Sequence, residues 1–68
     1  MQERIKEIRK KFEFTQKEFA LRIGVATCTV TNYERGYCKP SKAVVSRICH
    51  EFVVNEDWLR NGVGEMFF

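Results

Sequence analysis

Apolar side chains recur three and four positions apart at the start of the chain. Residues 2–12 place Ile5, Ile8 and Phe12 at this spacing, with charged side chains at most of the positions between them. Because an α-helix turns once every 3.6 residues, residues at this spacing share one face. The pattern predicts an amphipathic helix that packs its apolar face on a core.

A second helix is predicted over residues 15–23, and the sequence marks both of its ends. Thr15 is followed three positions later by Glu18, which is the spacing of a capping box, where two side chains satisfy backbone amides at the helix start. Gly24 stands where helices commonly end in a left-handed residue. The side chains predicted to be buried in between are Phe19, Ala20 and Ile23.

Residues 25–33 are ambiguous, because VATCTVTNY alternates small apolar and hydroxyl residues and is rich in β-branched side chains. This composition is typical of a half-buried strand. A strand needs a partner for its backbone, however, and the sequence holds no second alternating segment. A helix is therefore predicted near residues 26–34. Its inward side chains are expected to be Ala26, Val30 and Tyr33, and its outward ones Thr27, Cys28, Thr31 and Asn32.

A loop and a fourth helix follow. Gly36 and Pro40 mark the loop, and Ser41 can cap the helix after it. The stripe expected to be buried on this helix is Val45, Ile48, Cys49 and Phe52.

A fifth, short helix is predicted around residues 56–62. It is expected to place Trp58 and Leu59 against the core and to stop at Gly62. A chain of 68 residues is long enough for one small core. The prediction is an all-α fold of five short helices, with residues 1–68 forming a single domain.

The composition narrows the class of protein. Charged residues make up 31% of the chain and hydrophobic residues 44%, which is typical of a globular protein. Its apolar runs of two or three residues are far shorter than the roughly 20 needed to span a bilayer, and no signal segment opens the chain. A cytoplasmic protein without membrane contact is therefore expected.

The three cysteines lack the pattern of a metal site. Cys28, Cys38 and Cys49 are ten and eleven positions apart, whereas zinc ligands usually come in pairs two to four apart. Reduced thiols are expected, with no metal, no other cofactor and no small-molecule ligand. An enzyme is not expected either, because Cys49 and His50 are neighbours on a helix and no third group to orient the histidine is evident.

Charge is distributed unevenly along the chain. Residues 1–11 carry five basic and two acidic side chains, whereas residues 55–68 carry one basic and three acidic side chains. The basic end can face a polyanion while the acidic end faces away. A solvated helix face explains the N-terminal run equally well.

The segment TQKEFALRIGVATCTVTNYERGYCKPS, residues 15–41, resembles the helix-turn-helix of the Cro and lambda-repressor class, the XRE-type regulators of phages and bacteria. The resemblance extends through VNEDWLRNGVGEMF at residues 54–67. It implies a fold whose second and third helices form the helix-turn-helix. The matching features are Gln16 after the cap, Ala20 at the helix crossing, Gly24 in the turn, Val30 in the third helix, YERG at residues 33–36 and Pro40 before the next helix.

Two positions depart from the pattern of that family. Glu13 stands where glycine or asparagine is usual, so a left-handed backbone there would cost roughly 1 kcal/mol. Ala26 stands where a capping serine or threonine is usual, which forgoes about 1 kcal/mol. Both departures concern stability more than function.

The resemblance also implies roles for individual residues. In such proteins the third helix lies in the major groove of DNA and the second crosses the backbone. The candidates for base contacts are Thr27, Cys28, Thr31 and Asn32, and those for phosphate contacts are Gln16, Thr29, Arg35 and Lys39. An asparagine can pair bidentately with adenine, and threonine methyl groups can contact the thymine methyl. Cys28 is equally well explained as a small exposed residue.

The expected function is sequence-specific binding of double-stranded DNA by a transcriptional regulator. Among such regulators, a repressor is expected first. The alternative is a helical protein-interaction module such as an antitoxin or adaptor. Binding to paired half-sites implies a homodimer, for which Met66, Phe67 and Phe68 offer an apolar surface. These phenylalanines can equally fold back onto the first and fifth helices or lead into a further domain.

Overall fold

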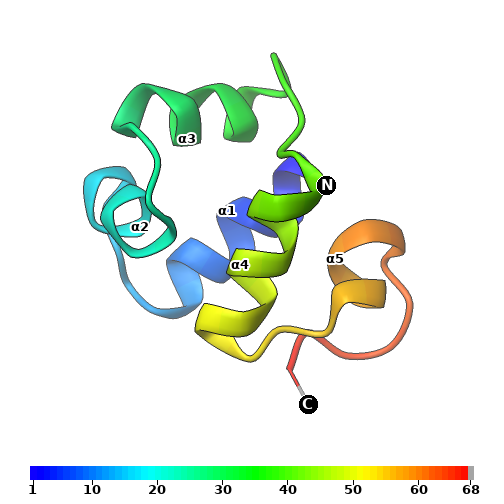
Figure 1. Cartoon of the computed structure of the whole chain (residues 1–68). Helices are drawn as coiled ribbons and strands as arrows, with labels where there is room; N and C mark the ends of the chain where they lie inside the picture. Colours follow the sequence, from blue (N-terminus) through cyan, green and yellow to red (C-terminus); the bar gives the residue numbers. More distant parts are fainter. Residues whose placement is uncertain (68) are drawn as a thin grey trace.

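The computed structural model describes residues 1–67, and within them it contains five α-helices (Figure 1). Helices α1 and α4 run through the middle of the molecule, α2 and α3 pack together on one side, and α5 lies on the other (Figure 1). The bounds are α1 Gln2–Lys11, α2 Gln16–Ile23, α3 Thr27–Arg35, α4 Lys42–Phe52 and α5 Glu56–Asn61. The predicted all-α fold of five short helices is confirmed, and residues 25–33 do not form a strand.

All five helices contribute side chains to one hydrophobic core. Phe52 is at the centre of an aromatic cluster: its ring stacks on Phe19 with centroids 5.3 Å apart and lies 5.1 Å from the ring of Phe12. Pairs of this kind add about 0.5–1.5 kcal/mol beyond the burial of their area. The buried residues are Ile5, Ile8, Phe19, Ala20, Ile23, Val30, Tyr33, Val45, Ile48, Phe52, Val54 and Leu59.

The predicted helix ends are confirmed at most positions. The hydroxyl of Thr15 accepts from the backbone N–H of Glu18 at 3.1 Å, and the Glu18 carboxylate accepts from the backbone N–H of Thr15 at 2.8 Å. Gly24 ends α2 in the left-handed region with a φ of 75°. Ser41 caps α4 by accepting from the N–H of Val44 at 3.3 Å. Local hydrogen bonds and a glycine therefore fix where α2 begins and ends and where α4 begins.

Two residues other than glycine adopt left-handed backbone angles. Glu13 does so after α1 with a φ of 57°, as the comparison with the family pattern led us to expect. Val53 does so after α4 with a φ of 55°, which the sequence did not indicate. A left-handed conformation costs a side-chain-bearing residue roughly 1–2 kcal/mol, and a β-branched residue is an outlier there. Both side chains are exposed, and each turn is closed by the residue after it: the N–H of Phe14 donates to the carbonyl of Arg9 at 3.1 Å, and that of Val54 to the carbonyl of Cys49 at 3.0 Å.

Some positions expected to be buried on helix faces lie elsewhere. Ala26, predicted to face inward, is exposed because it precedes α3 as the N-cap, with extended angles of φ −74° and ψ 153°. Phe12 follows the last residue of α1 and is 40% exposed, although its ring still contacts Phe52. Cys49 and Trp58 are half-buried and pack against the core.

The C-terminal segment folds back onto the helices. The backbone N–H of Asn55 donates to the carbonyl of Met66 at 2.8 Å, and Phe67 forms an isolated bridge with Val54. The ring of Phe67 meets Phe12 edge-on at 5.8 Å. Met66 and Phe67 are half-buried in this way, so they offer less apolar surface for a second copy than expected, and Phe68 lies outside the described residues.

Within residues 1–67, none of the helices combines the length and the apolar character that crossing a membrane requires.

Candidate nucleic-acid interface

A tight turn joins α2 to α3. Gly24 takes a left-handed conformation, and the backbone N–H of Val25 donates to the carbonyl of Ala20 at 3.0 Å. Ala20 is 2% exposed, and its small side chain belongs to the core between the two helices. This geometry lets α2 and α3 pack closely against each other.

Helix α3 has one buried and one solvated face. Successive residues of an α-helix are about 100° apart, so the outward candidates fall within an arc of about 140°. These candidates are Thr27, Cys28, Thr31 and Asn32. Val30 and Tyr33 lie on the opposite side, at 0% and 6% exposure. Thr27 and Cys28 are exposed and Asn32 is half-buried, so the structure brings the predicted outward residues together on one face.

Thr31 and Gln16 do not have the free side chains that the sequence indicated. The hydroxyl of Thr31 donates to the Gln16 amide oxygen at 2.6 Å, and the amide nitrogen of Gln16 donates to the Glu34 carboxylate at 3.2 Å. Both polar ends of the Gln16 side chain are therefore engaged inside the protein. Its backbone N–H lies in the first turn of α2, where amides have no partner within the helix.

Behind α3 lies an ion pair that the sequence did not reveal. The Arg9 guanidinium donates to the two carboxylate oxygens of Glu34 at 2.7 and 3.1 Å, and it also donates to the carbonyl of Phe14 at 2.9 Å. The Arg9 and Glu34 side chains are only 15% and 5% exposed. The pair links α1 to α3, and through Gln16 it also holds the start of α2. Its partners are 25 positions apart, so no local pattern could have signalled it.

The basic run at the start of the chain is partly used inside the molecule. Arg9 is paired as described, and Arg4 donates to the carbonyl of Leu59 at 3.4 Å. Among the phosphate candidates, Arg35 and Lys39 are exposed, whereas Thr29 is half-buried. Arg35, the last residue of α3, and Lys39, which follows it, are therefore exposed cations, and the N-terminal run is in part structural.

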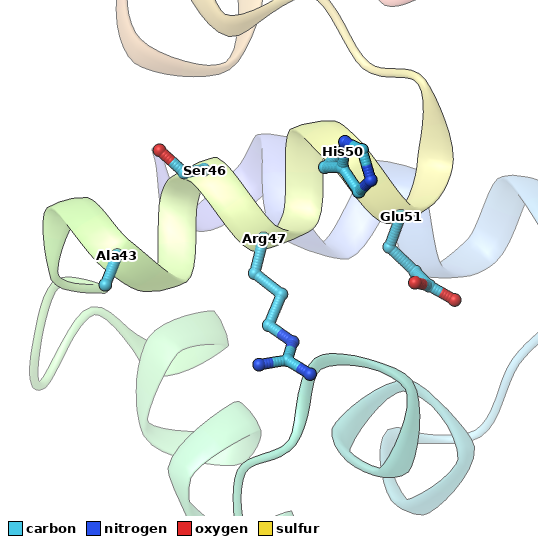
Figure 2. A pocket seen from close by; sticks show the side chains of 5 residues that line it. All are labelled: Ala43, Ser46, Arg47, His50 and Glu51. Carbon is cyan, nitrogen blue, oxygen red and sulfur yellow. The ribbon is translucent and has the colours of Figure 1, made fainter.

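A further cation lies beside the turn. Five exposed side chains of α4 surround an open depression, and one of them, Arg47, extends toward the segment between α2 and α3 (Figure 2). Its guanidinium carbon is 3.7 Å from the point where a side-chain carbon on Gly24 would stand. A cation at the C-terminal end of α2 interacts favourably with the helix dipole. No pattern in the sequence singles out Arg47.

The surroundings of Cys49 favour the protonated form of its thiol. Burial raises the pKa of the Cys49 thiol, Glu56 raises it further and Arg60 opposes them. A thiol that stays protonated is a poor nucleophile and a poor metal ligand. In the part of the chain that the structure describes, no three histidine, cysteine or acidic side chains lie together in a way that could hold a metal ion.

Helices α2 and α3 cross each other and are joined by a glycine turn. Helix α3 has a solvated face on one side and buried side chains on the other. This arrangement defines a helix-turn-helix domain. The family model described as a helix-turn-helix domain matches residues 2–65, and the chain belongs to this family. The resemblance to XRE-type regulators is thereby confirmed.

Three relatives show how far the similarity reaches. The chain is 42% identical over 52 residues to an uncharacterized HTH-type transcriptional regulator of Archaeoglobus fulgidus, covering 76% of this chain and 73% of the relative. It is 34% identical over 56 residues to the HTH-type transcriptional regulator ImmR of Bacillus subtilis, covering 82% and 44%. It is 34% identical over 65 residues to Antitoxin PezA of Streptococcus pneumoniae, covering 87% and 41%.

The chain thus spans less than half the length of the last two relatives. No solved structure matches it significantly.

Proposed function

We propose that this chain is a sequence-specific, double-stranded-DNA-binding transcriptional regulator, a repressor that acts in the cytoplasm with residues 1–68 as its DNA-binding domain. The observation that carries the proposal is the solvated face of α3, which is held from behind by Val30, Tyr33 and the Arg9–Glu34 pair. The family match and the two regulator relatives support DNA binding and transcription regulation as its role.

In this proposal α3 enters the major groove with its N-terminal half. Thr27, Cys28 and Asn32 reach base edges, while Thr31 acts mainly by joining α3 to α2. At the start of α2 the free backbone N–H groups and the helix dipole favour a phosphate, so Gln16 contributes its main chain instead of its amide. Thr29, Arg35 and Lys39 remain the proposed side-chain contacts to phosphate.

Specific binding by so few base contacts requires a second copy. We propose a homodimer that places two α3 helices on half-sites roughly 34 Å apart. The half-buried state of Met66 and Phe67 leaves less of the tail available for the contact. Sedimentation with and without a palindromic operator checks this: the dimer is expected on the operator, and one monomer per operator would contradict it.

The proposal is tested by selecting bound sequences from a random pool of duplex DNA and then titrating salt. A single enriched motif is expected, with log affinity falling linearly in log salt at about −0.9 per phosphate contact. Recovery of no motif, together with weak binding that does not depend on salt, would contradict the proposal.

A second candidate function is favoured by the similarity to Antitoxin PezA. In that case the chain is a helical interaction module that binds another protein. The same salt titration separates the two functions, because an interaction module is expected to show little affinity for DNA of any sequence.

A further inference from the structure

The reading face of α3 carries an unusual set of side chains. Residues 27–32 are TCTVTN and include no arginine, lysine or glutamine. Guanine is read most often by an arginine or lysine that donates to its O6 and N7 atoms. The part of the helix that enters the groove therefore lacks the usual reader of a G·C pair.

The hydrogen bonds behind α3 remove further polar groups from the face. The Thr31 hydroxyl and the Gln16 amide oxygen bind each other at 2.6 Å, and the other end of the amide binds Glu34. Gln16 is the long amide side chain that contacts α3, so it is not free to reach a base. With its hydroxyl engaged, the group that Thr31 has left to present is its methyl.

What remains is a surface of methyl groups, the hydroxyl of Thr27, one thiol and one amide. The amide belongs to Asn32, which is half-exposed. An asparagine amide matches the N6 and N7 atoms of adenine, and threonine methyl groups match the C5-methyl of thymine. These two features, the N6 and N7 atoms of adenine and the methyl group of thymine, are both presented by an A·T pair.

Arg35 is the cation that shares this face, but it lies at the far end of the helix. It comes eight positions after Thr27, which is roughly 12 Å along the axis. In helix-turn-helix complexes the first residues of the reading helix meet the bases. Arg35 is therefore placed nearer to the DNA backbone than to a base edge.

We propose that the half-site read by this chain consists of A·T pairs, with Thr27 and Cys28 packed on thymine methyl groups and Asn32 paired with adenine. This inference rests on the proposed DNA-binding function and defines the bases that the same site selects. Discrimination comes chiefly from methyl contacts and from the amide of Asn32, without hydrogen bonds to guanine.

The test replaces the thymines of the selected operator, one at a time, by deoxyuridine, which removes only the C5-methyl group. At one or more half-site positions the affinity is expected to fall about threefold to fivefold, as for the loss of one buried methyl. Thymines outside the half-sites are the matched control and are expected to tolerate the change.

A protein variant completes the design. Thr27→Ser removes a methyl and keeps the hydroxyl, so it is expected to weaken binding to the thymine operator and to abolish the effect of deoxyuridine at one position. Its melting temperature, close to that of the unmodified protein, shows that any loss of affinity is not a loss of fold.

Two results overturn the inference in distinguishable ways. An enriched operator in which every thymine tolerates deoxyuridine, while 7-deazaguanine in place of guanine lowers the affinity, would mean that a cation such as Arg35 reads guanine. DNA binding would then stand and the A·T inference would fail. If no sequence is enriched at all, the proposed function fails together with the inference.

Discussion

Helices α2 and α3 are neighbours of almost equal length, eight and nine residues, yet they are stabilised in different ways. Helix α2 begins with the Thr15–Glu18 capping box, which supplies partners for the backbone N–H groups of these two residues. Helix α3 begins at Ala26, which makes no side-chain hydrogen bond to the helix. Three threonines and a valine also give α3 a low intrinsic helix propensity.

Tertiary contacts compensate for these local weaknesses of α3. Val30 and Tyr33 are buried in the core, and the pair of Arg9 and Glu34 attaches its C-terminal half to α1. A helix held from behind does not depend on its outward residues for stability. The outward residues of α3 are therefore free to suit the DNA bases that we propose this helix to contact.

The largest effect is expected from breaking the support behind α3. Glu34→Ala should lower the free energy of unfolding by about 3 kcal/mol, because Arg9 is then left buried without its partner. Urea denaturation measures the change. The matched control is Glu51→Ala, whose 3.5 Å pair with Arg22 is exposed and should contribute less than about 1 kcal/mol. Equal losses in the two variants would contradict the role given to the buried pair.

A smaller effect is expected from removing the local support of α2. Thr15→Ala should lower the free energy of unfolding by about 1 kcal/mol, because the N–H of Glu18 loses its acceptor. Thr15→Ser keeps the hydroxyl and should remain near the parent stability in the same thermal melts. If the serine variant lost as much as the alanine variant, the cap would not be what stabilises this end.

The converse change should strengthen α3. Ala26→Ser places a capping hydroxyl where the backbone is already extended and should stabilise the protein by about 0.5 kcal/mol or more. Ala43→Ser is the control, since it puts the same residue at an exposed position inside α4 and should destabilise slightly. A lower melting temperature for Ala26→Ser would show that α3 begins elsewhere.

The smallest effect concerns pH. Hydrogen bonds from the backbone and then the side chain of Thr15 lower the pKa of the Glu18 carboxyl. Its folded pKa is thus below its unfolded one, so its contribution is complete above about pH 4.3 and is lost as the pH falls through the folded pKa. Glu18→Gln does not titrate, so the gap in melting temperature between it and the parent should narrow between pH 7 and pH 3. A gap that stayed constant would contradict this linkage.

Local patterns in the sequence predicted most of the fold. The box at Thr15 and Glu18, the glycine at residue 24 and the stripe of Ile5 and Ile8 act within one or two helical turns, so spacing alone reveals them. Val53 could not be predicted as a left-handed residue, because its own preference opposes that conformation; it forms the turn between α4 and the buried Val54.

The candidate site was predicted only in part. The arc of Thr27, Cys28 and Asn32 follows from helical periodicity, but the engagement of Gln16 and Thr31 depends on how α2 crosses α3. Periodicity assigns a residue to a face and does not say which neighbour lies opposite. For the same reason Arg9 looked like one cation in a basic run, although the fold pairs it with Glu34.

The most direct test of the account compares Asn32→Ala with Lys39→Ala on the selected operator and on random DNA. Asn32→Ala should weaken operator binding about 5- to 150-fold and leave binding to random DNA nearly unchanged, because it removes a base contact. Lys39→Ala should weaken both by a similar factor, because a phosphate contact does not depend on sequence. If Asn32→Ala lowered the affinity for operator and random DNA equally, the solvated face of α3 would not be the surface that reads the bases.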